Sequence, residues 1–155
     1  MPGTVRYQWE PQTGRLKPDR ALGRPEYPTE IVVLLTTQEG SRAALMKAAE
    51  LARDLRGRIR LLAPRVVPYP LPVSKGGSEE AMLRRQCVRL AAECGVNVQV
   101  DILLCRDNRE TAAAAVAPEA LVVVGGRGRW WPTRERRMAN WLRRQGRQVL
   151  FTECE

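Results

Sequence analysis

Short apolar runs alternate with amphipathic stretches along the chain from residue 30 onward. Uninterrupted apolar runs are typical of parallel strands covered on both faces, and apolar positions three or four residues apart are typical of helices that pack on such a sheet. The pattern predicts a single α/β domain with a doubly wound parallel five-stranded sheet and helices on both faces. The strands are expected at Ile31–Leu35, Arg58–Ala63, Val96–Leu104, Leu121–Val124 and Gln148–Thr152, and the helices at Ser41–Arg56, Ser78–Cys94, Arg109–Val116 and Pro132–Gln145.

Local signals refine these boundaries. Ser41 is expected to cap the first helix, and Asp107 or Asn108 the third. Pro64 is expected to end the second strand, because proline has no N–H to donate. The third strand alternates between apolar and polar residues, which predicts an edge strand with one face in solvent.

Residues 1–29 follow neither periodicity. They contain five prolines and three glycines, a composition that predicts an extended or partly ordered N-terminal arm ahead of a domain at residues 30–155. Tyr7 and Trp9 are the exceptions to the polarity of this segment. We expect them to hold it against the domain or against a second subunit.

The length of 155 residues suits one domain. No apolar window reaches the ~18 to 20 residues needed to span a bilayer, and the first residues lack the apolar segment of a secretory signal. We therefore expect a cytoplasmic protein without a membrane segment. The four cysteines are widely spaced, with no C-x-x-C pair, and are expected to be reduced.

The chain contains no histidine. This excludes Ser-His-Asp and Cys-His catalytic sites and every zinc site that uses histidine. It also removes the usual general base. We expect a protein that is not an enzyme and that holds no metal.

Positive charge is concentrated toward the C-terminal end of the sequence. The net charge is +9, and residues 127–155 hold eight arginines against three glutamates. A local basic patch suits an anionic ligand, a nucleic acid or an acidic partner. A solvated helix face has the same composition, so both interpretations stay open.

A glycine-rich segment follows the fourth predicted strand, in the sequence LVVVGGRGR. A strand-to-helix turn of this kind lies on the edge of an open α/β sheet where ligands bind. Glycines there let backbone N–H groups approach an anion. The predicted anion-binding residues are Gly125, Gly126, Arg127, Gly128 and Arg129.

From Glu30 to Glu153 the chain resembles the universal stress protein domain. The resemblance rests on the order of the elements, on SRAALMKAAELARDL in the first helix and on LVVVGGRGRWW at the fourth strand. It implies the strand order 3-2-1-4-5, with Thr36 facing the glycines across a crevice. It also implies homodimers, commonly paired through the last strand, which is Gln148–Thr152 in this chain.

The residues that hold ATP in that family are only partly present. The family pattern is G-x-x-G, nine residues, then glycine and a hydroxyl residue; Gly125 and Gly128 match its first half, whereas Ala139 stands where the hydroxyl belongs. The resemblance also aligns Thr36 with an adenosine-binding aspartate, and Pro64 with a valine whose backbone meets the adenine. We therefore expect no cofactor, with ATP disfavoured.

The leading hypothesis is thus a non-enzymatic stress-response or regulatory protein of the universal stress protein type that has lost ATP binding. The first alternative is a binding module for another anionic ligand, a phosphorylated metabolite or nucleotide, held at Gly125–Gly128. The second alternative is nucleic-acid binding through the arginines of residues 127–147, although the sequence has no continuous basic stripe.

Overall fold

A computed structural model of the protein describes residues 3–10, 12–18, 29–66, 77–95, 97–128 and 133–154. Its elements alternate between strand and helix from residue 30 onward, after a pair of strands near the start of the chain. In chain order they are β1 (Gly3–Glu10), β2 (Arg15–Pro18), β3 (Glu30–Leu34), α1 (Gln38–Leu55), β4 (Arg58–Val66), α2 (Gly77–Cys94), β5 (Val98–Cys105), α3 (Asn108–Ala115), β6 (Leu121–Arg127), α4 (Arg134–Arg144) and β7 (Gln148–Cys154).

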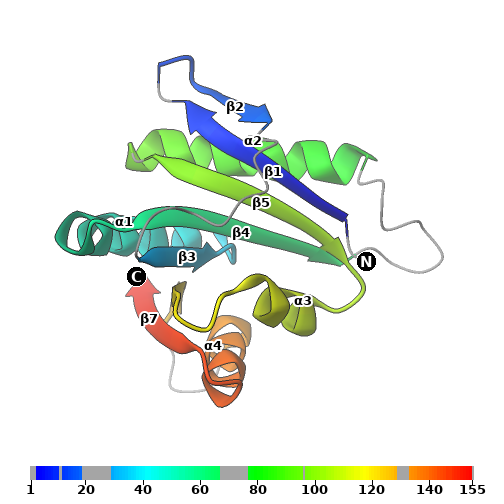
Figure 1. The fold of residues 1–155 in the computed structure, drawn as a ribbon. Coiled ribbons are helices and arrows are strands. Elements are labelled where there is room, and N and C mark those ends of the chain that lie inside the picture. The colour runs from blue at the N-terminus through cyan, green and yellow to red at the C-terminus, as the bar shows by residue number, and fades with distance from the viewer. Residues whose placement is uncertain are drawn as a thin grey trace.

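The strands form one seven-stranded sheet in the order β2-β1-β5-β4-β3-β6-β7 (Figure 1). The α/β class is confirmed, and the five predicted strands form the parallel part of the sheet, β5-β4-β3-β6-β7. Their order is the 3-2-1-4-5 order that the family resemblance implies. The prediction of an all-parallel, five-stranded sheet is wrong, because β1 and β2 add two antiparallel strands beside β5.

The N-terminal segment is part of the sheet rather than a separate arm. Strands β1 and β2 form a hairpin in which Tyr7 and Trp9 are 6% and 4% exposed, so the prediction that these two side chains hold the segment to the domain is confirmed. They alternate with Arg6, Gln8 and Glu10, which is the period-two pattern of a half-buried strand. The prolines of the segment made a strand appear unfavourable in the sequence. Pro18, however, is the last residue of the short outer strand β2, where a missing N–H is tolerated. Residues 19–28 lie outside the described residues.

Strand β5 is not an edge strand. Every residue from Val98 to Cys105 is buried, because β1 covers one side of the strand and β4 the other. The alternation in its sequence has another cause. Gln99 and Asp101, 4% and 2% exposed, face a buried set of charged side chains instead of water.

Two strands run further than their sequences predict. Strand β4 continues through Pro64 to Val66, and from Ala63 onward its neighbour is β5 alone, because the pairing with β3 ends at Leu62. A proline is tolerated where one side of a strand is open. Strand β6 continues through Gly125 and Gly126, which pair in register with β7 and do not form a turn.

Helices cover both faces of the sheet, as predicted (Figure 1). On one face α1 and α2 bury a core that includes Leu45, Leu90 and Val123. On the other face α3 and α4 bury a second core that includes Ala112, Leu142 and Val124. The first helix begins three residues before the predicted Ser41, because the Thr37 side chain accepts a hydrogen bond from the Gly40 N–H and caps it.

A group of charged side chains, with the buried Asp101 at its centre and three half-buried partners, joins four strands on the face covered by α3. Asp101 Oδ1 lies 2.9 Å from Arg6 Nε, and Asp101 Oδ2 lies 3.4 Å from Arg60 Nη1. Arg60 Nε in turn forms an ion pair with Glu30 at 3.0 Å, and its Nη2 donates to the Ala115 carbonyl. The hairpin, the sheet centre and the end of α3 are therefore tied together by one ionic network.

Candidate functional site

The predicted site lies where β3 and β6 end side by side. This is the switch point of the sheet, where the chain turns to opposite sides and ligands of open α/β proteins bind. Thr36 follows β3, and its hydroxyl donates a hydrogen bond to the Gly125 carbonyl at 2.8 Å. The structure thus brings Thr36 and the first glycine together, as the sequence predicts.

The first turn of α1 packs directly on the backbone of β6 at this point. A Cβ built on Gly125 would lie 1.8 Å from the Gly40 carbonyl oxygen, and one built on Gly40 would lie 2.4 Å from the Gly125 oxygen. The Thr36 N–H is also used, since it donates to Ser41 Oγ at 2.8 Å. Protein backbone therefore fills the space between the two strand ends, and both glycines are required by this close approach.

The remaining predicted residues lie among carboxylates. Arg127 Nη2 is 3.3 Å from Glu39 Oε2, so this guanidinium is already paired. A Cβ on Gly128 would meet the Glu153 carboxylate at 2.5 Å, and one on Gly126 would meet Glu135 Cβ at 2.9 Å. Such surroundings disfavour an anion. Arg129 lies outside the described residues.

The described arginines of residues 134–147 divide into two groups. Arg136 contacts Glu153 at 3.0 Å and lies over the Phe151 ring, Arg143 donates to the Val149 carbonyl, and Arg147 donates to the Ala113 carbonyl. Arg136 and Arg143 therefore join α4 to β7, and Arg147 joins the turn between them to α3. Exposed arginines form the other group: Arg134, Arg137 and Arg144. Most of the local excess of positive charge is therefore either structural or spread along one exposed helix face.

Ala139 and Pro64, the two other positions aligned with the family's ATP-binding residues, do not lie where the alignment implies. Ala139 is fully buried in α4 within the second core, so a ligand at the sheet edge does not reach it. Pro64 lies inside β4 rather than after it. The position that follows β4 is residue 67, which is outside the described residues.

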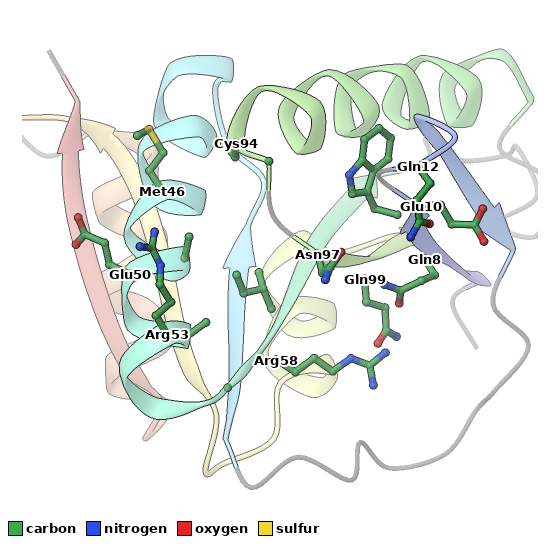
Figure 2. A pocket seen from close by; sticks show the side chains of 16 residues that line it. Gln8, Glu10, Gln12, Met46, Glu50, Arg53, Arg58, Cys94, Asn97 and Gln99 are labelled. Carbon is green, nitrogen blue, oxygen red and sulfur yellow. The ribbon is translucent and has the colours of Figure 1, made fainter.

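The larger described cavity lies at the opposite, amino-terminal edge of the parallel strands. It has a volume of about 1050 Å³ and is bounded by the hairpin, the second half of α1, the end of α2 and the starts of β4 and β5. Met46 and Arg53 project from α1 on one side, and Gln8 and Gln99 from the sheet on the other (Figure 2). Sequence reasoning missed this cavity, because one of its walls is the hairpin that was predicted as an arm.

The lining of this cavity is balanced in charge and chemically unreactive. Two arginines, Arg53 and Arg58, line it together with two glutamates, Glu10 and Glu50. Its one thiol, Cys94, has a pKa raised by burial and by the neighbouring Glu93 carboxylate. A protonated thiol is a poor nucleophile, so the arrangement suits binding better than covalent catalysis.

Two further thiols and one phenol are also held in their protonated forms. Burial raises the pKa of the Cys87 thiol to about 12, and it raises that of Cys105 as well. The pKa of Tyr7 is raised to about 12 by burial and by its hydrogen bond to Glu80. Within the described ranges, no cluster of three metal-ligating side chains occurs, and no helix there is both long and apolar enough to cross a bilayer.

Comparison with known proteins adds no family. Neither models of protein families nor curated proteins give a significant match to this chain. Its function therefore has to follow from its own residues and geometry.

Proposed function

We propose that this protein is a non-enzymatic regulatory protein of the universal stress protein type, in which the nucleotide crevice is filled by the protein's own first helix. The parallel strand order supports the first part of the proposal. The contact between Gly40 and Gly125 carries the second part. A protein of this kind acts through its surfaces and its assembly, because the proposal includes no catalytic reaction at the carboxyl-terminal ends of its strands.

Three contacts support the loss of ATP binding. Backbone atoms of α1 and β6 touch where the two strand ends would have to separate to admit a nucleotide. The Thr36 hydroxyl already donates to Gly125, so it offers an adenosine no carboxylate and no unused donor. The carboxylates of Glu39 and Glu153 lie beside Arg127 and Gly128, where a triphosphate would meet like charge.

Thermal unfolding in the presence of magnesium and ATP tests this proposal. A ligand at 100 times its Kd stabilises the native state by about 2.7 kcal/mol, which raises the Tm of a domain of this size by roughly 5 to 10 °C. We expect no change in Tm at millimolar ATP, with an ATP-binding universal stress protein as the positive control. A saturable rise in Tm that Thr36→Val abolishes would show that the crevice opens and would refute the proposal.

The free edge at β7 supports the homodimer that the proposal includes. Among the described strands β7 pairs only with β6. Val149, Leu150 and Phe151 are all half-buried along this seven-residue edge. Open edges with apolar side chains are normally covered, and a second copy paired through β7 would cover this one.

Analytical ultracentrifugation measures the assembly directly. We expect a dimer for the wild type and a monomer for Leu150→Lys, which places charge on the free edge. Leu55→Lys is the matched control, since Leu55 is 48% exposed and belongs to α1, not to the edge strand. A monomeric wild type at tens of micromolar would contradict the assembly.

A further inference from the structure

Four carboxamide side chains line the cavity of about 1050 Å³ at the amino-terminal edge of the parallel strands. Gln8 and Gln99 come from β1 and β5, and they are direct partners in the antiparallel register of these two strands. Gln12 comes from the turn between β1 and β2, and Asn97 from the segment before β5. Figure 2 shows Gln8, Asn97 and Gln99 close together on one side of the cavity. This side of the cavity therefore offers both hydrogen-bond donors and acceptors.

Two polar residues of the lining are almost completely buried and still have unused hydrogen-bonding atoms. Trp9 and Gln99 are each 4% exposed. Among the described residues the Trp9 indole N–H has no acceptor, and the Gln99 side chain makes one long contact, 3.5 Å from its nitrogen to Asp101 Oδ1, that leaves its carbonyl oxygen unused. Neither atom is among the fully enclosed ones that lack a partner, so both are open to the cavity that their residues line. Buried polar groups are nearly always hydrogen-bonded, which indicates that these two meet their partner inside the cavity.

The charged groups of the lining do not select a charged ligand. Glu10 and Glu50 each pair with a lysine, at 3.9 and 3.4 Å. Arg58 also has a partner, and the side chain of Arg53 is exposed. What the cavity wall offers to a ligand is therefore mainly neutral hydrogen bonding.

The apolar part of the lining is aliphatic. It includes Ala49, Ile59 and the 59% exposed Met46. Trp9 is the one aromatic residue of the described lining, and at 4% exposure its ring faces are covered by the protein. A planar base binds best where it can stack on an aromatic face, so this wall suits a molecule with aliphatic carbons better than a nucleobase.

We propose that this cavity binds a neutral polyhydroxylated molecule of the size of a mono- or disaccharide. A hydroxyl donates and accepts hydrogen bonds, and so does a carboxamide, so adjacent hydroxyls match the adjacent carboxamides of Gln8 and Gln99. The carbon–hydrogen faces of a sugar ring would pack on the aliphatic wall. The volume is at the upper end of the range of small-molecule sites. The site lies at the opposite edge of the sheet from the filled crevice and does not depend on it.

Proton–nitrogen correlation spectra of the full chain test the proposal, because the Trp9 indole N–H gives its own signal. The chain has four tryptophans, and the Trp9→Phe variant assigns that signal by its loss. The probes are maltose, glucose and myo-inositol, with adenosine and inorganic phosphate as controls of other chemical classes. We expect a saturable shift of the Trp9 signal with at least one of the three polyols, and none with adenosine or phosphate. A tighter fit to maltose would identify a disaccharide, and a tighter fit to glucose or myo-inositol a single ring; both outcomes support the site.

Matched glutamine variants show whether the carboxamides hold the ligand. Gln8→Leu removes a half-buried carboxamide and should weaken binding of the polyol at least about fivefold. Gln99→Met removes the buried carbonyl oxygen and should have a similar effect. The exposed Asn97→Ala keeps the test usable if Gln99→Met does not fold. Gln86→Leu is the matched control, since Gln86 is also half-buried, belongs to α2 and does not line this cavity, and it should leave binding unchanged.

Three results would overturn the proposal. The first is an unchanged Trp9 signal with all three polyols, which would mean that water alone satisfies the polar groups of the cavity. The second is equal weakening by Gln8→Leu and Gln86→Leu, which would place the binding elsewhere. The third is a saturable shift with adenosine or phosphate that exceeds the shift with every polyol, which would assign the cavity to an aromatic or an anionic ligand. Circular dichroism of each variant checks that it is folded.

Discussion

Replacement of Gly125 by alanine should destabilise the protein more than any other substitution in the glycine segment. The new Cβ would lie 1.8 Å from the Gly40 oxygen and 2.6 Å from the Gly40 carbonyl carbon, and both are backbone atoms. The first turn of α1 would have to move away from β6, which also breaks the Thr36–Gly125 hydrogen bond. Overpacking costs up to about 3 kcal/mol and a lost hydrogen bond about 1 kcal/mol, so we expect a loss of about 3 to 4 kcal/mol.

The neighbouring glycines provide a graded control. Gly126→Ala meets Glu135 Cβ at 2.9 Å, which moves only with α4, and should cost about 2 kcal/mol. Gly128→Ala meets the exposed carboxylate end of Glu153, which can rotate away, and should change stability by less than about 0.5 kcal/mol. Urea unfolding followed by circular dichroism measures the series. Gly40 and Gly125 share one contact. The double variant Gly40→Ala with Gly125→Ala should therefore lose less stability than the sum of the losses in the two single variants.

Equal free energies of unfolding for the three glycine-to-alanine variants would refute this reasoning. If Gly125→Ala unfolds at the urea midpoint of the wild type, then α1 does not rest on β6 and the crevice is open. If Gly128→Ala is the most damaging of the three, the glycines are needed for the turn itself, as the phosphate-loop interpretation requires. Far-UV spectra in native buffer confirm that each variant folds.

Two further predictions concern the buried polar groups. Asp101→Asn should lower the free energy of unfolding in urea by about 3 kcal/mol, because it leaves Arg6 and Arg60 without their shared carboxylate. The control is Glu50→Gln in the exposed pair with Lys47, which should cost less than about 0.5 kcal/mol. Equal effects of the two substitutions would contradict a buried network. Because the pKa values of Cys87 and Tyr7 are raised to about 12 from 9.0 and 10.0, the unfolded state loses these protons first and stability should fall as pH rises from about 9 to about 12. Cys87→Ala should remove up to about 1.4 kcal/mol per pH unit of that slope between pH 9 and 10, measured from urea midpoints.

The parallel part of the fold could be predicted because its signals are local. Runs such as IVVLL are buried on both faces, and each is followed by a helix with a clear apolar stripe. The hairpin could not be predicted in the same way, since Tyr7 is buried against β5 and α2, which lie far along the chain. The same dependence on distant partners made β5 resemble an edge strand, because its polar residues meet Arg6 and Arg60 and not water.

The sequence predicted where the candidate site lies in the fold, but not how the protein packs there. Sequence placed Thr36 and the glycines at the sheet edge, and the hydrogen bond between Thr36 and Gly125 agrees with that placement. Gly40 carried no signal of its own, because a glycine in a first helical turn is unremarkable until its neighbour in space is known. The cavity at the amino-terminal edge of the parallel strands is lined by residues of β1, α1, α2, β4 and β5, and no spacing within the sequence reveals that combination.

The pairing of β1 with β5 imposes an order of events on synthesis. Arg6 and Asp101 are 95 residues apart, and a ribosome adds about 5 to 20 residues per second, so β1 leaves the ribosome roughly 5 to 20 s before its partner strand exists. During that interval its polar row, Arg6, Gln8 and Glu10, gives the strand the charged character that discourages pairing with other nascent chains. Arg6, which later pairs with Asp101, and its two polar neighbours therefore protect the unpaired strand from aggregation. A change that makes these three side chains apolar should lower the yield of soluble protein before it lowers the stability of the finished fold.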